Sequence, residues 1–191
     1  MKVALASGNA NKLRELRSCF PGWRIEPISA AVPEEDGSTY YENAAAKARF
    51  GFEVTPGSWI LGEDSVLEVE GLGGRPGLHS ARYAGPDEEP IAKLLSELDG
   101  VTGEGRGARY VCELVLFGPD GRELRATGVL EGAIAQAPRG SEGFGYDPVF
   151  VPAGESRTVA ELGNEWKCAH SHRSRAAAAL RRALSDGAAT L

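Results

Sequence analysis

The sequence predicts an α/β fold with a mixed β-sheet flanked by helices. Short apolar runs of strand length alternate with helical patterns of apolar residues, and one pair of longer strand patterns is joined by a hairpin turn. No internal repeat, low-complexity tract or linker interrupts this order. Because 191 residues suit one hydrophobic core, we expect residues 1–191 to form a single domain.

Strand and helix patterns alternate from the start of the chain. Strands are predicted at residues 3–6, 24–28 and 59–61, and helices at residues 13–20 and 40–52. Asn9 or Asn11 can cap the first helix, and Thr39 with Glu42 forms a capping box before the second. This alternation predicts the α/β class.

The second half of the chain adds a hairpin to the predicted sheet. A helix is expected at residues 90–98, followed by two strands at residues 109–117 and 123–135. A glycine-rich loop at residues 139–147, a short strand at residues 149–151 and a final helix at residues 171–184 come next. Gly118, Pro119, Asp120 and Gly121 form the turn between the two long strands. An antiparallel pair therefore joins the sheet and makes it mixed.

Composition excludes several classes of protein. A net charge of −6 argues against a binder of nucleic-acid polymers or of membrane surfaces, because both need an excess of cations. No stretch approaches the roughly 18 apolar residues of a membrane span. Three widely separated cysteines make neither a disulfide framework nor a zinc motif. We therefore expect a cytoplasmic protein.

The first turn of the chain is a candidate phosphate site. Ser7, Gly8, Asn9 and Lys12 stand where a strand passes into a helix, so loop amides, a hydroxyl and an ammonium could converge on an anion. The spacing is not that of a Walker loop. A capped turn with a surface lysine is the alternative interpretation.

Two adjacent carboxylates follow the third predicted strand. On a strand, Glu63 and Asp64 would point to opposite faces, and we choose Asp64 as the one that serves a site. It either solvates the end of the strand or binds magnesium, which favours one or two carboxylates together with phosphate oxygens and water. A second acid would come from residues 34–36 or from Glu42. The capping role of Glu42 makes Glu35 or Glu34 the better candidate.

Two later segments could contact a nucleobase. Phe144–Asp147 supplies two aromatic rings and a carboxylate within a glycine-rich turn, which suits either base stacking or an aromatic plug. Ser171, His172 and Arg173 begin the last helix. Their donors could read the carbonyl edge of a base, or they could be a capping serine followed by exposed cations.

These segments together carry a resemblance to a known family. Its blocks are Ser7-Gly8-Asn9 with Lys12, Glu42-Asn43-Ala44 with Lys47, Glu63-Asp64-Ser65, Leu72-Gly73-Gly74 through Pro76-Gly77, Ser80-Ala81-Arg82-Tyr83, Gly143-Phe144-Gly145-Tyr146-Asp147-Pro148 and Ser171-His172-Arg173. In this order they resemble the inosine triphosphate pyrophosphatase family. The resemblance implies an elongated mixed sheet, two lobes around a central cleft and a homodimer.

The resemblance also implies an activity and a set of site residues. The activity is magnesium-dependent hydrolysis of ITP, dITP and XTP to the monophosphate and pyrophosphate. Asp64 would be the catalytic base and would bind Mg²⁺ together with Glu35. Residues implied to bind the triphosphate are Ser7, Gly8, Asn9, Ala10, Asn11, Lys12 and Lys47. Other substrate contacts are implied for Ser65 and Lys167, and Phe144, Gly145, Tyr146, Asp147, His172 and Arg173 would enclose the purine.

Three further expectations follow from the comparison with this family. Val66 replaces a glycine of many bacterial members, and a β-branched residue predicts extended backbone there. Asp64 and Lys12 should share a groove that holds the polyphosphate. Donors on His172 or Arg173 should favour a 6-carbonyl purine over adenine. A Maf-type pyrophosphatase and a nucleotide-binding protein without turnover are the alternatives.

Overall fold

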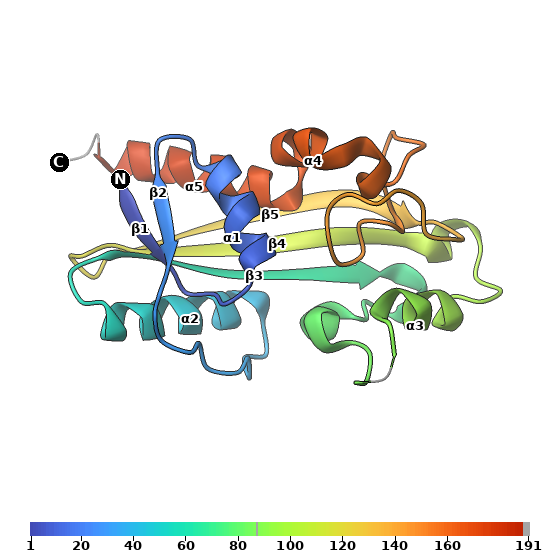
Figure 1. Ribbon diagram of the computed structural model, residues 1–191, viewed down its shortest axis with the longest axis horizontal. Helices are drawn as coiled ribbons and strands as arrows, with labels where there is room; N and C mark the ends of the chain where they lie inside the picture. Colours follow the sequence, from blue (N-terminus) through green and yellow to red (C-terminus); the bar gives the residue numbers. More distant parts are fainter. Residues whose placement is uncertain (87, 189–191) are drawn as a thin grey trace. The chain divides into compact units, whose positions relative to one another are not determined.

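The computed structural model describes residues 1–86 and 88–188 and contains, within them, one six-stranded sheet (Figure 1). Its strands are β1 (Lys2–Leu5), β2 (Arg24–Pro27), β3 (Trp59–Val69), β4 (Gly107–Phe117), β5 (Glu123–Ile134) and β6 (Phe150–Pro152). Their order is β2-β1-β3-β4-β5-β6. Strand β1 pairs in parallel with β2 and β3, and β5 pairs antiparallel with β6. The predicted mixed α/β sheet is confirmed.

Helices connect and flank these strands. They are α1 (Ala10–Cys19), α2 (Tyr40–Val54), α3 (Pro90–Glu97), α4 (Val159–His170) and α5 (His172–Ala188). The sequence did not predict α4, which begins with a capping box between Thr158 and Glu161. None of the helices in the described part of the chain is both long enough and apolar enough to cross a membrane.

The chain divides into two compact units. Unit 1 contains Met1–Asp64, Cys112–Gly128 and the segment from His172 onward, and unit 2 contains Ser65–Val111 and Val129–Ser171. The boundaries fall within β3, β4 and β5. Each unit has a hydrophobic core made of its own residues.

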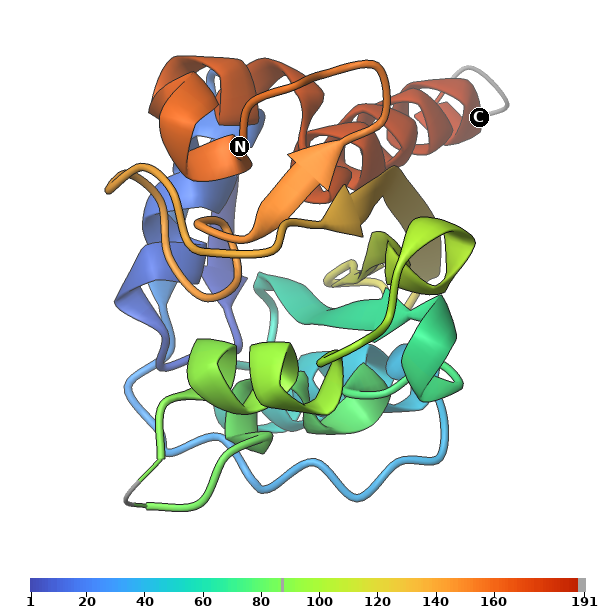
Figure 2. The ribbon, with the colours of Figure 1, turned by 90° about the vertical axis from the view of Figure 1, so that its right-hand side faces the viewer.

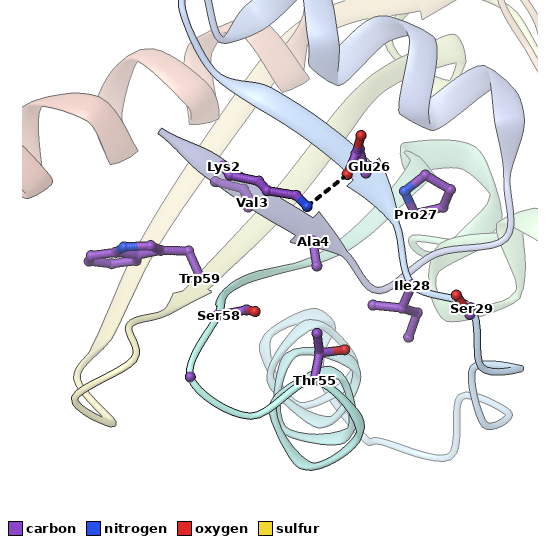
Figure 3. A pocket seen from close by; sticks show the side chains of 11 residues that line it. Lys2, Val3, Ala4, Glu26, Pro27, Ile28, Ser29, Thr55, Ser58 and Trp59 are labelled. Carbon is purple, nitrogen blue, oxygen red and sulfur yellow. Dashed lines mark ion pairs between the residues drawn. The ribbon is translucent and has the colours of Figure 1, made fainter.

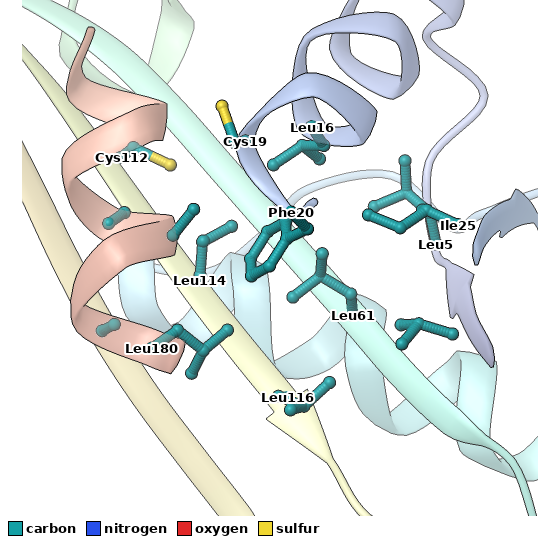
Figure 4. Packing of buried hydrophobic residues seen from close by; sticks show 14 residues of the cluster. Leu5, Leu16, Cys19, Phe20, Ile25, Leu61, Cys112, Leu114, Leu116 and Leu180 are labelled. Carbon is teal, nitrogen blue, oxygen red and sulfur yellow. The ribbon is translucent and has the colours of Figure 1, made fainter. Parts of the chain in front are cut away.

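Unit 1 has helices on both faces of its strands. Leu61 on β3 packs with Leu16 of α1 and Leu180 of α5 in one cluster (Figure 4). The preceding residue, Ile60, packs with Ala44 of α2 in another cluster. Because consecutive strand residues point to opposite faces, α1 and α5 cover one face of β3 and α2 covers the other.

Unit 2 is built on the remaining parts of the long strands. Its core contains Leu67 of β3, Leu94 of α3 and Phe150 of β6. Figure 2 shows two helices of this unit, α3 in green and α4 in orange-red. The buried guanidinium of Arg106 donates to four backbone carbonyls, including that of Leu98 after α3 and that of Ile134 in β5. This arginine therefore joins α3 to the end of β5.

One prediction about strand length was wrong. The sequence suggested that the third strand ends before Glu63 and Asp64, whereas β3 runs without a break from Trp59 to Val69. Both carboxylates are buried within the strand because cationic side chains neutralise them, as described below. The extended backbone predicted at Val66 is confirmed.

A glycine on β5 fixes the position of α5. A Cβ atom on Gly128 would lie 2.1 Å from the His172 carbonyl oxygen and 2.4 Å from the Ala176 nitrogen. Contacts this short cannot be relieved without moving the helix backbone, so the first turn of α5 can approach β5 only over a glycine.

We predict that Gly128→Ala lowers the free energy of unfolding by about 1–3 kcal/mol, the usual cost of overpacking. The control is Gly85→Ala, because a Cβ at Gly85 meets nothing within 4 Å. Urea unfolding followed by circular dichroism measures both variants. An unchanged midpoint for Gly128→Ala would show that α5 is not held this closely.

Candidate active site

The turn between β1 and α1 is preorganised by its own side chains. The Asn9 Oδ1 atom accepts hydrogen bonds from the backbone N–H groups of Asn11 at 2.9 Å and Lys12 at 3.2 Å, which makes Asn9 the helix cap. The Ser7 hydroxyl accepts from the Asn9 N–H at 3.2 Å. Gly8, Asn9 and Ala10 are exposed. The turn thus presents the positive end of the α1 dipole to solvent, as an anion site requires.

The strand order places this turn at a switch point of the sheet. Strand β1 lies between β2 and β3, and the helices that follow β1 and β2 cover opposite faces. Pairing of β1 with β3 ends at Leu5 and Leu61. Glu63 and Asp64 therefore lie on β3 just beyond the carboxyl end of β1, where open α/β sheets bind their ligands.

Glu63 is the buried centre of one group of charges. Its carboxylate is 0% exposed, and it contacts Lys12 Nζ at 2.7 Å and Arg173 Nε at 3.0 Å. The Cys112 thiol lies 3.9 Å from the same carboxylate. Burial alone would raise the pKa of Glu63, but the charges of Lys12 and Arg173 hold that pKa well below its usual range.

Asp64 points to the other face of β3, toward α2. It is 3% exposed, it accepts a hydrogen bond from Asn43 Nδ2 at 3.3 Å, and its Oδ1 atom lies 3.4 Å from Lys47 Nζ. Burial raises the pKa of Asp64, and the Lys47 charge only partly opposes this. The Lys12 charge also acts on Asp64. The predicted opposite orientation of the two carboxylates is confirmed.

Lys47 joins Asp64 to the acidic loop before α2. Its ammonium group donates to the Glu35 carboxylate, to the Glu63 carbonyl oxygen at 2.9 Å and to Asp64. Burial alone would lower the pKa of Lys47, but the neighbouring carboxylates, led by Asp64, raise it. Gly62 allows this approach, because a Cβ there would lie 2.0 Å from the Ala44 carbonyl oxygen of α2.

The first residues of α5 are buried in unit 1. Arg173 contacts Glu63 through Nε and Glu15 through Nη1, each at 3.0 Å. His172 is also buried. The alternative in which these two residues are exposed cations is therefore wrong, because carboxylates of α1 and β3 and the close approach to Gly128 enclose them. Their contact with a base stays a prediction.

Unit 2 contains a second group of predicted site residues. The buried Asp147 carboxylate accepts from the Phe144 N–H and from Lys167 Nζ, both at 2.7 Å. The Lys167 ammonium group lies 4.0 Å from the centre of the half-buried Phe144 ring. The buried Tyr146 hydroxyl donates to the Ser80 carbonyl oxygen at 3.0 Å. Tyr146 thus plugs the turn, whereas Phe144 keeps part of its ring accessible.

The remaining predicted residues take ordinary positions. Gly145 is exposed with φ at 63°, a conformation that favours glycine, and Ser65 is half-buried on β3. In unit 1 the structure brings Lys12 and Arg173 together at Glu63 on one face of β3, and Lys47 and Glu35 together with Asp64 on the other face. It gathers Phe144, Asp147 and Lys167 in unit 2.

Sequence reasoning missed three participants in unit 1. Asn43 orients Asp64, Glu63 binds two of the predicted cations, and Glu15 binds Arg173. Asn43 stood within a family block, and Glu63 is adjacent to the chosen aspartate. Nothing in the local sequence distinguishes Glu15 from an exposed helical glutamate.

No metal cluster is built into the described residues. Among residues 1–86 and 88–188, no three His, Cys, Asp or Glu side chains gather in a way that could hold a metal ion. Glu35 and Asp64 instead converge on the Lys47 ammonium group. The two carboxylates thus already share one cation.

A cavity of about 430 Å³ lies elsewhere in unit 1. It is lined by Lys2, Glu26, Thr55 and Trp59 among others, and an ion pair of 3.3 Å joins the first two of these residues (Figure 3). No residue of the predicted site lines it.

Comparison with known proteins identifies relatives along nearly the whole chain. The model of the Ham1 family matches residues 3–183. The dITP/XTP pyrophosphatase of Thermus thermophilus is 44% identical over 98% of this chain and 93% of its own length. The dITP/XTP pyrophosphatase of Deinococcus deserti is 46% identical over 97% of this chain and 90% of its own length.

Solved structures of Ham1 proteins also match this chain along nearly its whole length. The Ham1 protein of Staphylococcus aureus superimposes with a TM-score of 0.84 at 36% identity, over 98% of this chain and 100% of that one. The nucleoside-triphosphatase, or dITP/XTP pyrophosphatase, of Mycobacterium abscessus superimposes with a TM-score of 0.72 at 43% identity, over 94% of this chain and 98% of that one. These matches confirm the resemblance carried by the sequence motifs, and the chain belongs to the Ham1 family.

Proposed function

We propose that this protein hydrolyses the noncanonical purine nucleoside triphosphates ITP, dITP and XTP to the monophosphate and pyrophosphate. The relatives named dITP/XTP pyrophosphatases support this proposal. The observation that carries it is the buried Asp64, which lies beside Lys47 just beyond the carboxyl end of β1 and is acted on by the charge of Lys12 in the first turn of α1. A cytoplasmic homodimer, expected from the sequence and the family resemblance, is part of the same proposal.

The triphosphate would bind at the turn and the two lysines. The exposed amino-terminal end of α1 suits phosphate oxygens, and Lys12 and Lys47 supply positive charge. Lys12 keeps part of its side chain accessible, at 14% exposed.

The charges of the site argue for a metal that arrives with the substrate. Lys12, Lys47 and Arg173 face the four carboxylates of Glu15, Glu35, Glu63 and Asp64. These cations are already balanced by carboxylates, whereas the triphosphate brings about four further negative charges. A divalent cation would supply the missing positive charge.

Glu35 and Asp64 fit such a cation. They offer hard oxygen donors that already converge on one positive group, and Mg²⁺ prefers one or two carboxylates with phosphate oxygens and water. When bound, Mg²⁺ would neutralise the phosphates and stabilise the pyrophosphate leaving group.

Asp64 is the proposed general base. Burial makes its carboxylate a better proton acceptor, since its pKa is raised, and Asn43 fixes its orientation. A carboxylate held in this way would align a water molecule with the α-phosphorus and accept its proton at an Asp64 oxygen.

The family resemblance assigns selectivity for the base to Phe144 of unit 2 and to His172 and Arg173 of unit 1. The ring of Phe144 is half-buried and would stack on the purine. Donors on His172 or Arg173 would pair with a 6-carbonyl group, and the 6-amino group of adenine would leave them unpaired.

Asp64→Asn should reduce pyrophosphate release from ITP by about a hundredfold or more, since the amide cannot accept the proton. A coupled pyrophosphate assay measures the rate. Binding of the nucleotide, measured by calorimetry, should persist. The control is Asp99→Asn, an exposed aspartate of unit 2. Undiminished turnover by Asp64→Asn would remove Asp64 from the mechanism.

A panel of ITP, XTP and ATP tests the substrate class. We expect monophosphate and pyrophosphate from ITP and XTP, with kcat/KM for ATP lower by a factor on the order of 10⁴. Product analysis by anion-exchange chromatography separates this from a phosphatase, which would release orthophosphate. Equal turnover of ATP and ITP would contradict the proposal, as would binding without any hydrolysis.

Glu35→Gln should raise the Mg²⁺ concentration for half-maximal activity by about tenfold or more, because a neutral amide is a weaker ligand. The matched control is Glu34→Gln, which makes the same change at the exposed neighbour on the same loop. If the effect occurs in Glu34→Gln instead, the metal ligand has been assigned to the wrong residue.

A further inference from the structure

Four charged side chains of alternating sign are linked in unit 1. Lys12 pairs with Glu63, Glu63 with Arg173, and Arg173 with Glu15, at 2.7, 3.0 and 3.0 Å. Lys12 and Glu15 both belong to α1, so the helix itself closes the set into a ring. We call these four residues the charge ring.

We propose that Glu63 is a positioning residue that fixes the Lys12 ammonium group for contact with the triphosphate. This inference rests on the proposed function. Glu63 is 0% exposed and so cannot touch the substrate itself. Glu63 can act on the substrate only through neighbouring groups, and of the cations that it contacts Lys12 is the one at the phosphate turn.

The geometry explains why such a tether is useful. Lysine has four rotatable methylene groups and carries a point charge, so an untethered ammonium group occupies many positions. The buried carboxylate restricts it to one position, and Arg173 holds the other oxygen of that carboxylate in place. Catalysis depends on orientation at this scale, since small displacements of a binding group reduce the rate.

Glu63 has opposite effects on the position of the Lys12 ammonium group and on the attraction of that group for phosphate. A carboxylate next to Lys12 weakens the net pull of that lysine on phosphate, so Glu63 should not improve substrate affinity. Its benefit should fall on kcat, because only a correctly placed ammonium group favours the transition state over the bound substrate.

The test compares two buried glutamates of neighbouring strands. Glu63→Gln removes the charge that holds Lys12. The matched control is Glu113→Gln on β4, whose carboxylate is also buried but contacts Arg125 and Thr127. We expect Glu63→Gln to lower kcat for ITP by about tenfold or more with KM no higher than in the wild type. Glu113→Gln should keep both constants.

A double-mutant cycle shows whether Lys12 carries the effect. In a Lys12→Met background, adding Glu63→Gln should cause little further loss of kcat, because the tethered group is already gone. Additive losses would overturn the proposal, and so would a wild-type kcat in Glu63→Gln or an equal loss in Glu113→Gln.

A conservative variant covers the case in which Glu63→Gln does not fold. Glu63→Asp keeps the charge but withdraws the carboxylate from Lys12 by one methylene group. We expect a smaller loss of kcat with unchanged KM, and a wild-type kcat in folded Glu63→Asp would overturn the proposal. If the wild-type protein does not hydrolyse ITP, the proposed function fails. If it does and the Glu63 variants match it, only this inference fails.

Discussion

The burial of two adjacent carboxylates in the middle of β3 is the constraint on which the site depends. Strand geometry sends Glu63 and Asp64 to opposite faces, so different cations form ion pairs with the two side chains. Lys12 of α1 and Arg173 of α5 meet Glu63, whereas Lys47 of α2 meets Asp64. An unpaired buried charge would be strongly destabilising. The positions of the helices around β3 are thus tied to the charges of the site.

Features that depend on neighbouring residues were predictable from the sequence. An asparagine cap, left open between Asn9 and Asn11 and found at Asn9, follows from short-range turn chemistry, as does the helix from Tyr40, and the extended backbone at Val66 follows from side-chain shape. The assignment of Asp64 and Lys47 to one site came from the family resemblance, and the structure places them 3.4 Å apart.

Features that depend on distant partners were not predictable. The local sequence predicts that the strand ends before Glu63, because a carboxylate is seldom buried. The strand continues because Arg173, 110 residues later, neutralises Glu63. Helix α4 was missed because its polar sequence includes Gly163, whose φ of 88° interrupts the helical backbone. For Glu63 the deciding interaction lies outside the window in which a sequence pattern is recognised, whereas for α4 a glycine inside the helix interrupts the helical pattern.

Lys47 connects the resting charges of the site to its proposed chemistry. Its ammonium group now occupies the space between Glu35 and Asp64, the two carboxylates proposed to bind magnesium. Two cations so close together would repel each other. On the proposed function, Lys47 must therefore exchange these carboxylates for phosphate oxygens when substrate and metal bind. Such an exchange would keep every charge paired and would make metal binding and triphosphate binding mutually dependent.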